Sequence, residues 1–420
     1  MLSGDDVTVG PVTRSRPGVP LLDRRVIGLT LAVVVFLWSW SFLDHSFYAR
    51  GRIVDTGVYQ GYGLAIRQSQ VPYRDFEVEY PPGSLPVFVA PTFVGHPTNL
   101  NDYGTWFARL MEVCGLLCLL FVVLARPPGR GVAFLAVAPL LVGSLLLTRF
   151  DLWPTALLTA ALAGFVRDRH RLGWFALALA FSAKLFAVVV VPLAAVWTLR
   201  RRGRAELLRG SLVGLVTIAA VFAPFAILAP HGLWESLWGQ FSRPLQIESL
   251  AASYLMTFVR PGVVISHDAL AIGGHGTLAA ATTVAEITSL IALWIAFARG
   301  PAETQRLVRF AAASVCAFVV FGKVLSPQFL IWLVPLLALV RGRRGVLATA
   351  LLIVALADTQ FYFYLPRYDA YIDEYRYAWL VLARNLLLLG VLATLVVALP
   401  GARPSLRQTR RPAPLGTPAG

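Results

Sequence analysis

Long apolar runs recur along this 420-residue sequence, and they constrain its fold more than any other feature. Apolar residues make up 57% of the chain and charged residues only 14%, whereas a soluble domain carries roughly 25% charged residues. Runs of about 15 to 25 apolar residues predict transmembrane helices, because ~20 helical residues cross the hydrocarbon core. The composition excludes a two-layer soluble domain and predicts an all-α, polytopic bundle of transmembrane helices.

The first apolar run covers residues 26–42 and is followed by Leu43, Asp44 and His45. A secretory signal peptide would end in small residues at its cleavage site. No such site follows the run, so we interpret it as an uncleaved first helix.

The net charge of +15 has two possible explanations, nucleic-acid binding and membrane topology. The arginines gather in short loops between apolar runs, which is typical of cytoplasmic loops rather than of a binding surface for nucleic acid. We therefore expect no nucleic-acid partner. The clusters lie at residues 24–25, 126–130, 167–171, 200–209, 341–344 and 403–411.

Placing these loops in the cytoplasm predicts about twelve spans with both termini inside. We expect a cytoplasmic segment at 1–25, a transmembrane domain at 26–399 and a disordered basic tail at 400–420. Two long outer loops follow from this topology, at 44–103 and 231–276.

Three parts of the predicted bundle are shorter than a full span. Residues 82–97 are apolar but proline-broken, and we interpret them as re-entrant or interfacial. The hairpins at 131–166 and 172–199 have arms of only about 11–17 residues. Short or broken helices usually line a cavity rather than face lipid.

Metal and disulfide chemistry are not indicated. Cys114, Cys118 and Cys316 all lie in apolar segments, and the six histidines are scattered without a metal-binding pattern. The spacing predicts neither a disulfide framework nor a zinc site. We expect no metal and no cofactor.

The first outer loop concentrates carboxylates beside a membrane helix. Asp55 begins a run with helical spacing that includes Tyr59. Aspartate is a good helix N-cap, and it is also a good proton acceptor. Either role, or both, would explain Asp55.

Further along this loop, Asp75, Glu77 and Glu79 alternate with aromatic and apolar residues up to Tyr80. A solvated extended segment is one interpretation. The rigid Pro-Pro-Gly turn that follows favours another, a site held against the membrane surface. In the second case Asp75, Glu79 and Tyr80 would face substrate.

The chain has only two lysines, Lys184 and Lys323, and both lie in apolar sequence. Each could extend to the headgroup layer or bind a lipid phosphate. Asp151 lies at the tip of a short hairpin, in the sequence Arg149-Phe150-Asp151.

The second outer loop contains Arg243, Gln246 and Glu248 next to an apolar helix start. Pairing of Arg243 with Glu248 is one interpretation, and contact with sugar hydroxyls or phosphate is the other. Gln328, in a Ser-Pro-Gln turn, allows the same two interpretations.

Five motifs in order carry a family resemblance: DTGVYQGYGLA…VPYRDFEVEYPPG, RFDLWPTALLTAALAG, FSAKLFAVVVVP, RPLQIESL and GKVLSPQFLIWLVP. From about residue 28 to 398 the chain resembles glycosyltransferase family 87, within the integral-membrane transferases of the GT-C fold. The resemblance implies a polyprenyl phosphate mannose donor. It also implies a glycolipid or glycan acceptor on the outer face of the membrane. The preference for arginine over lysine in the sequence predicts a bacterial source, and hence a bacterial cytoplasmic membrane. An acidic residue of the first outer loop is the family's catalytic base. Asp55 matches that position best, and Glu79 is the second candidate.

The mechanism that this implies is an inverting transfer, with Lys184, Lys323 or Arg243 binding the donor phosphate. Membrane lipids would surround the protein. A transporter or a flippase for lipid-linked sugar is the alternative, since about twelve spans with broken helices fit it too, although no matching halves are present. The predicted substrate-binding residues are Tyr59, Asp75, Tyr80, Asp151, Gln246, Glu248 and Gln328.

Overall fold

The computed structural model describes residues 24–125, 129–266 and 269–397. Helices account for most of this part of the chain, which confirms the predicted all-α transmembrane bundle. Most of the predicted N-terminal segment 1–25 and the whole of the predicted tail 400–420 lie outside the described residues.

Seven helices of the described chain are long and apolar enough to cross a membrane. Most of their bounds agree with the apolar runs of the sequence to within a few residues. They are α1 (Arg24–Ser41), α5 (Leu100–Leu124), α10 (Val191–Leu228), α13 (Gly276–Arg299), α14 (Thr304–Phe321), α16 (Gly342–Tyr362) and α18 (Ala378–Val396).

Shorter apolar helices fill the centre of the bundle. α6 (Gly129–Val142) and α8 (Leu152–Val166) form the first predicted hairpin, with the single turn α7 (Leu145–Thr148) between them. α9 (His170–Ala183) and the 3-10 helix η4 (Leu185–Val190) form the start of the second. Because these helices are shorter than a full crossing, the count of about twelve spans stays a prediction.

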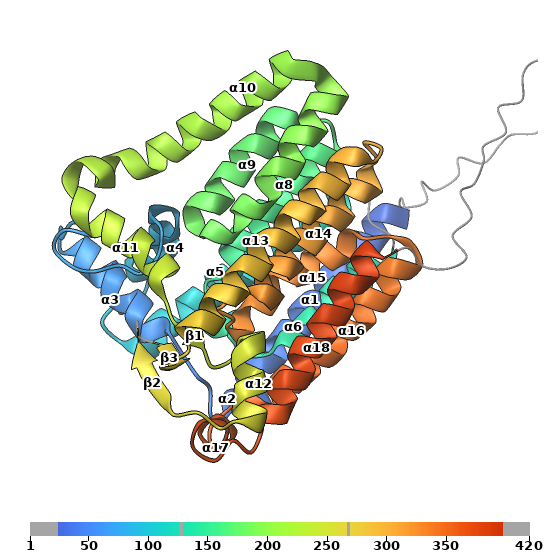
Figure 1. Cartoon of the computed structure of the whole chain (residues 1–420). Coiled ribbons are helices and arrows are strands. Elements are labelled where there is room, and N and C mark those ends of the chain that lie inside the picture. The colour runs from blue at the N-terminus through green and yellow to red at the C-terminus, as the bar shows by residue number, and fades with distance from the viewer. Residues whose placement is uncertain (1–23, 126–128, 267–268, 398–420) are drawn as a thin grey trace, which may run out of the picture.

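The sequence predicts an arginine-rich loop at 200–209 after the second hairpin, but α10 is helical through these residues from Val191 to Leu228. The two halves meet at Gly203, whose φ of +81° turns the chain. Glycine adopts this backbone region without the steric strain of a Cβ. Figure 1 shows α10 bending at the top of the molecule and running across to α11 (Pro230–Ser242).

The first predicted outer loop folds into short helices. η1 (Phe42–Asp44), α2 (Ser46–Ala49) and α3 (Thr56–Arg67) precede an extended stretch. The segment predicted to be re-entrant or interfacial then forms three successive turns, of which the first packs against α9 and the other two against α3 and α5. These turns are η2 (Pro82–Ser84), α4 (Leu85–Val89) and η3 (Ala90–Phe93).

The second predicted outer loop contains a small sheet that the sequence analysis does not anticipate. β1 (Leu245–Gln246), β2 (Val263–Ser266) and β3 (Ala269–Ile272) form an antiparallel sheet in the order β1-β3-β2. α12 (Leu250–Phe258) connects the first two strands. The loop is therefore a compact structure that holds its polar residues in place.

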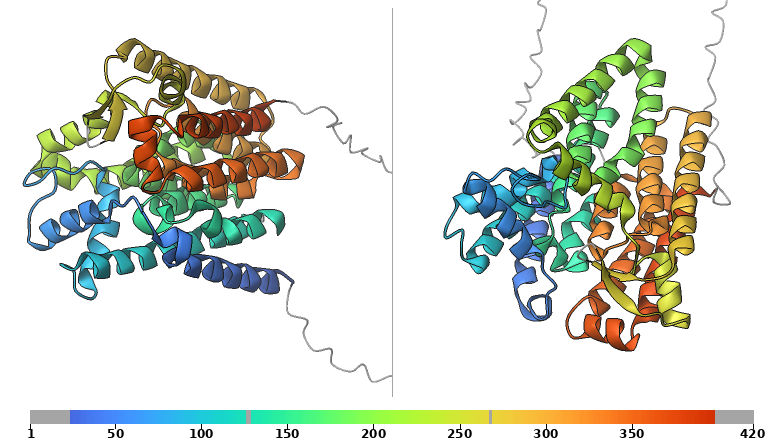
Figure 2. Two further views of the ribbon diagram at one scale, coloured as in Figure 1. Left: turned by 90° about the horizontal axis from the view of Figure 1, so that it is seen from below. Right: turned by 60° about the vertical axis from the view of Figure 1, so that its left-hand side comes forward.

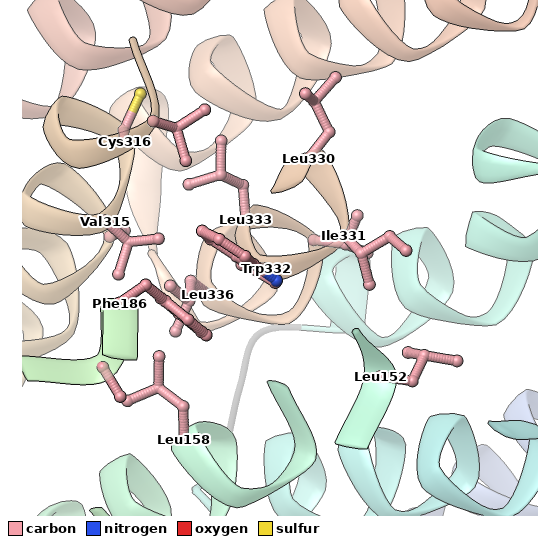
Figure 3. Packing of buried hydrophobic residues seen from close by; sticks show 14 of the residues in the cluster. Leu152, Leu158, Phe186, Val315, Cys316, Leu330, Ile331, Trp332, Leu333 and Leu336 are labelled. Atoms are coloured by element: carbon pink, nitrogen blue, oxygen red, sulfur yellow. The ribbon is translucent and has the colours of Figure 1, made fainter. Parts of the chain in front are cut away.

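α15 (Leu330–Leu339), which follows the 3-10 turn η5 (Pro327–Phe329), lies at the centre of the packing, and every one of its residues is buried. Figure 3 shows Trp332 of this helix lying flat against Phe186 of η4, with ring centroids 3.8 Å apart and planes 8° from parallel. Stacked rings of this kind add to the free energy of burial alone. The contact fixes α15 against the end of the second hairpin.

The two ends of the bundle differ. α3, α4, α11, the sheet and α17 (Arg367–Glu374) gather at the lower left of Figure 1, and the turn between α13 and α14 lies at the upper right. The views in Figure 2 agree with this separation. The polar outer-loop residues singled out in the sequence are thereby brought to one end.

Candidate active site

Asp55 occupies the N-cap position of α3, but its side chain makes no capping hydrogen bond. Its backbone carbonyl accepts the amide of Val58 at 3.0 Å, while its carboxylate forms an ion pair with Arg149. Arg149 lies between α7 and α8, and its side chain is only 8% exposed. The carboxylate is thus directed into the protein rather than onto its own helix.

Lys184, at the C-terminal end of α9, is held inside the protein and does not extend to a membrane surface. Its Nζ lies 2.7 Å from Asp151 Oδ1, and the same oxygen accepts a hydrogen bond from Trp332 Nε1 at 2.6 Å. The ammonium also lies 4.8–5.2 Å from the ring centroids of Phe150, Phe329 and Trp332. Three rings and one carboxylate together compensate its loss of water.

Arg243 follows α11 and pairs with Glu79 rather than with Glu248, so the pairing expected within the second outer loop is wrong. Its Nη2 lies 3.1 Å from Glu79 Oε1. Gln240 of α11 donates to the backbone carbonyl of Glu79 at 2.7 Å. The two predicted outer loops are therefore joined at this point.

These three ion pairs form one charged cluster, which we define as Asp55, Glu79, Arg149, Asp151, Lys184 and Arg243. Arg149 and Arg243 are both close enough to interact electrostatically with Lys184.

Burial lowers the pKa of Arg149 to about 10, against the opposing effect of Asp151, so the guanidinium stays charged at neutral pH. Arg149 Nε, Arg243 Nε and Asp151 Oδ2 are buried without a hydrogen-bond partner in the described chain. The cluster therefore has spare donors next to its positive charges.

Tyr59 and Tyr80 line one side of the charged cluster. Tyr59 stacks on Phe88 with centroids 4.6 Å apart, and Tyr80 meets the edge of Phe150 at 4.8 Å. Both tyrosines interact electrostatically with Asp151. Tyr59 is almost fully buried, so of these two rings only the partly exposed Tyr80 is accessible to a sugar ring.

Four predicted site residues take positions outside the cluster. Asp75 pairs with the exposed Arg74, with Arg74 Nε 2.9 Å from Asp75 Oδ1. Lys323 donates to the carbonyl of Phe241 at 2.7 Å. Gln328 Oε1 accepts the hydroxyl of Ser326. Gln246 lies in β1 and lines a small pocket together with Arg243.

Glu248 lies at the centre of a separate buried network. It accepts hydrogen bonds from Tyr362 at 2.7 Å, Tyr368 at 3.1 Å and Arg384 at 3.1 Å. Burial raises its pKa, and Arg384 opposes that effect. Tyr368 and Glu248 are also electrostatic neighbours of Arg149, so this network adjoins the charged cluster.

The sequence analysis does not select Arg149 or Trp332 as site residues. A signal for Arg149 was present, because it is a lone arginine between two apolar segments, where a charge is costly. Trp332 lies within an apolar run, and its sequence context carried no such signal. Among the residues that the structure describes, no three or more His, Cys, Asp or Glu side chains are grouped so that they could hold a metal ion.

Comparisons with known proteins add little to this geometry. No protein-family model and no curated protein matches the chain. Two crystal structures of ArnT from Cupriavidus metallidurans are similar at a distance. One is bound to undecaprenyl phosphate (TM-score 0.48, 16% identity) and the other is in the apo state (TM-score 0.47, 15% identity). Each match covers 88% of this chain and 76% of that one. A likeness at this level assigns no activity, and the resemblance to glycosyltransferase family 87 stays a prediction.

Proposed function

We propose that this protein is a membrane glycosyltransferase. It takes a sugar, mannose, from a polyprenyl phosphate donor and passes it to a glycolipid or glycan acceptor on the outer face of a bacterial cytoplasmic membrane. The observation that supports this is the charged cluster, where three cations and three carboxylates meet at one end of a transmembrane bundle. The sequence resemblance to family 87 supports the choice of donor and sugar.

The cations supply the binding site for the donor phosphate. Arg149, Lys184 and Arg243 come from three different parts of the chain, and their charges lie close together. A partly buried positive group stabilises the charge that develops on a leaving phosphate far better than water does. Lys323, which donates to Phe241, supports the loop that carries Arg243.

A carboxylate supplies the base. The acceptor oxygen attacks the anomeric carbon, and the bond from this carbon to the phosphate oxygen breaks. The phosphate leaves with the electron pair, and the acceptor's proton passes to the carboxylate, with inversion at the anomeric carbon. Asp55 is the proposed base and Glu79 the second candidate. Their side chains are 28% and 29% exposed, so an acceptor hydroxyl can reach both.

The deciding experiment is transfer by the purified full chain in lipid nanodiscs, with labelled polyprenyl phosphate mannose and extracted membrane glycolipids. Asp55→Asn should lower turnover by at least about 100-fold, the usual range for losing a general base. Glu79→Gln should lower it less. Glu235→Gln is the matched control, since Glu235 is an exposed carboxylate on α11.

Two outcomes would overturn the proposal. Near-normal turnover by Asp55→Asn would exclude Asp55 as the base. Movement of labelled donor across vesicle membranes by the wild-type protein, without any glycosidic product, would show a flippase instead.

A further inference from the structure

In the charged cluster, three negative charges are paired with three positive charges. Asp55 pairs with Arg149, Asp151 with Lys184, and Glu79 with Arg243. An entering phosphodiester adds one negative charge to this balance. A buried anion needs a cation and hydrogen-bond donors close to it. One of the three carboxylates must therefore give up at least part of its contact with its cation.

Burial shows which pairs are fixed. The Lys184–Asp151 pair is only 14% and 1% exposed at its two side chains, and Trp332 also donates to Asp151. Separating these two would leave a charge isolated in the interior, which is strongly unfavourable. Glu79 is more exposed, but Gln240 holds its backbone in place against α11. Neither of these carboxylates is well placed to move.

Asp55 is the carboxylate best placed to leave. Its side chain is 28% exposed and lies at the start of α3, in an outer loop, so water can take up its charge as it moves away. Within the cluster, the carboxylate of Asp55 forms an ion pair with Arg149 and with no other cation. A carboxylate tied to an arginine is also a poor proton acceptor, because the positive charge favours its ionised form.

Arg149 is ready to accept a different partner. Its guanidinium is buried, and its Nε has no hydrogen-bond partner in the described chain. Asp151 and Glu248 lie near enough to hold the positive charge in place without Asp55. A guanidinium binds phosphate with two parallel hydrogen bonds, which a single ammonium cannot provide.

From these observations, and resting on the proposed function, we propose that the donor phosphate and Asp55 compete for Arg149. Binding of the donor then displaces Asp55 from Arg149 and frees its carboxylate to take the acceptor's proton. The base is thereby activated only when a donor is present. The exchange breaks and forms only ion pairs and hydrogen bonds.

A double-mutant cycle on binding, without turnover, tests this competition. The ligand is a short-chain polyprenyl phosphate without sugar, titrated calorimetrically into the full chain in detergent. Asp55→Asn should tighten binding about tenfold, or ~1.4 kcal/mol, because the competitor for Arg149 is gone. Arg149→Gln should weaken binding, and adding Asp55→Asn to it should change the affinity less than about twofold.

Controls separate the competition from simpler effects. Glu235→Gln removes a distant carboxylate and should leave the affinity unchanged. Inorganic phosphate and vesicles of phosphatidylglycerol should bind more weakly than the polyprenyl phosphate, and neither should show the tenfold change. Arg149→Lys, which keeps the charge, replaces Arg149→Gln if the latter lowers the unfolding temperature. In the Arg149→Lys protein, the gain in affinity caused by Asp55→Asn should again be smaller than in the wild-type protein.

Unchanged or weaker binding by Asp55→Asn would overturn the inference, as would an equal gain with and without Arg149. Either result leaves the proposed function intact if transfer still depends on Asp55. A wild-type chain that does not bind polyprenyl phosphate would overturn the inference and the proposed function together.

Discussion

The guanidinium of Arg384 lies 3.1 Å from the carboxylate of Glu248, and neither side chain is more than 1% exposed. Arg384 belongs to α18, a candidate membrane span, and Glu248 lies two residues before α12, in the second predicted outer loop. Arg384 Nη2 also donates to the backbone carbonyl of Glu248 at 2.7 Å. The pair therefore fastens the second outer loop to the bundle.

Removing one member of this pair should destabilise the protein strongly. Arg384→Met leaves Glu248 buried without its cation, and changes of this type cost about 3–5 kcal/mol. We expect a markedly lower unfolding temperature for the purified protein in detergent. Arg376→Gln is the control, because Arg376 is 62% exposed in its pair with Glu374 and should change little. Equal unfolding temperatures for the two variants would contradict a structural role for the buried pair.

Lys184→Met should abolish phosphate binding at the charged cluster. The change keeps much of the side-chain volume but removes the charge, and loss of one electrostatic donor typically lowers turnover by about 100- to 1000-fold. Lys184→Arg should not restore activity, because three aromatic rings enclose the ammonium and leave little room for a planar guanidinium. Turnover and affinity for polyprenyl phosphate are the measurements. Activity of Lys184→Met within a few-fold of wild type would place the donor elsewhere.

Trp332→Phe isolates one hydrogen bond. The phenyl ring can still stack on Phe186, but Asp151 loses the donor that lies 2.6 Å away. Leaving a buried acceptor partly unsatisfied costs about 1–3 kcal/mol, so the unfolding temperature and turnover should both fall. The control is Trp379→Phe, since Trp379 is 59% exposed on α18. Identical losses in the two variants would show that only the size of the indole matters.

Gly83→Ala should separate the first outer loop from Lys184. A Cβ at Gly83 would come within 2.5 Å of the backbone of Ser182, two residues before the lysine. Because the backbone of Ser182 cannot move aside as a flexible side chain can, the loop that carries Glu79 must shift. Turnover should then fall at least tenfold, since misplacing a reacting group by ~1 Å can lower the rate even further. Gly61→Ala, on α3, meets nothing within 4 Å and should be neutral. Full transfer activity in Gly83→Ala would refute this positioning role.

Most of the helical framework could be predicted because apolar runs mark membrane helices directly. α1 (Arg24–Ser41), for example, follows the first apolar run, residues 26–42, to within two residues at each end. The join at Gly203 could not be predicted in the same way. Its arginine-rich flanks were interpreted as a loop, yet arginine is also a good helix former. The strands of the small sheet were missed because segments of two to four residues carry no periodicity.

The charged cluster was only partly foreseeable. Asp55, Lys184 and Arg243 stood out because charges next to membrane helices are expensive. Their partners did not follow, because Arg243 and Glu79 are 164 residues apart and a nearer carboxylate, Glu248, was the simpler choice. Arg149 was named only as part of the hairpin tip, although its burial and its ion pair with Asp55 place it in the cluster. Pairing across the fold depends on how the helices pack, which one sequence does not reveal.

The contact of Trp332 with Asp151 also has a consequence for how the protein is made. Asp55 enters the growing polypeptide early, whereas the indole that completes the cluster belongs to α15, near the C-terminal end of the bundle. A nascent chain released before that helix would carry Asp55 and the Lys184–Asp151 pair but would lack the indole that also donates to Asp151. The hydrogen-bonding around Asp151 would thus be complete only after α15 had been inserted into the membrane.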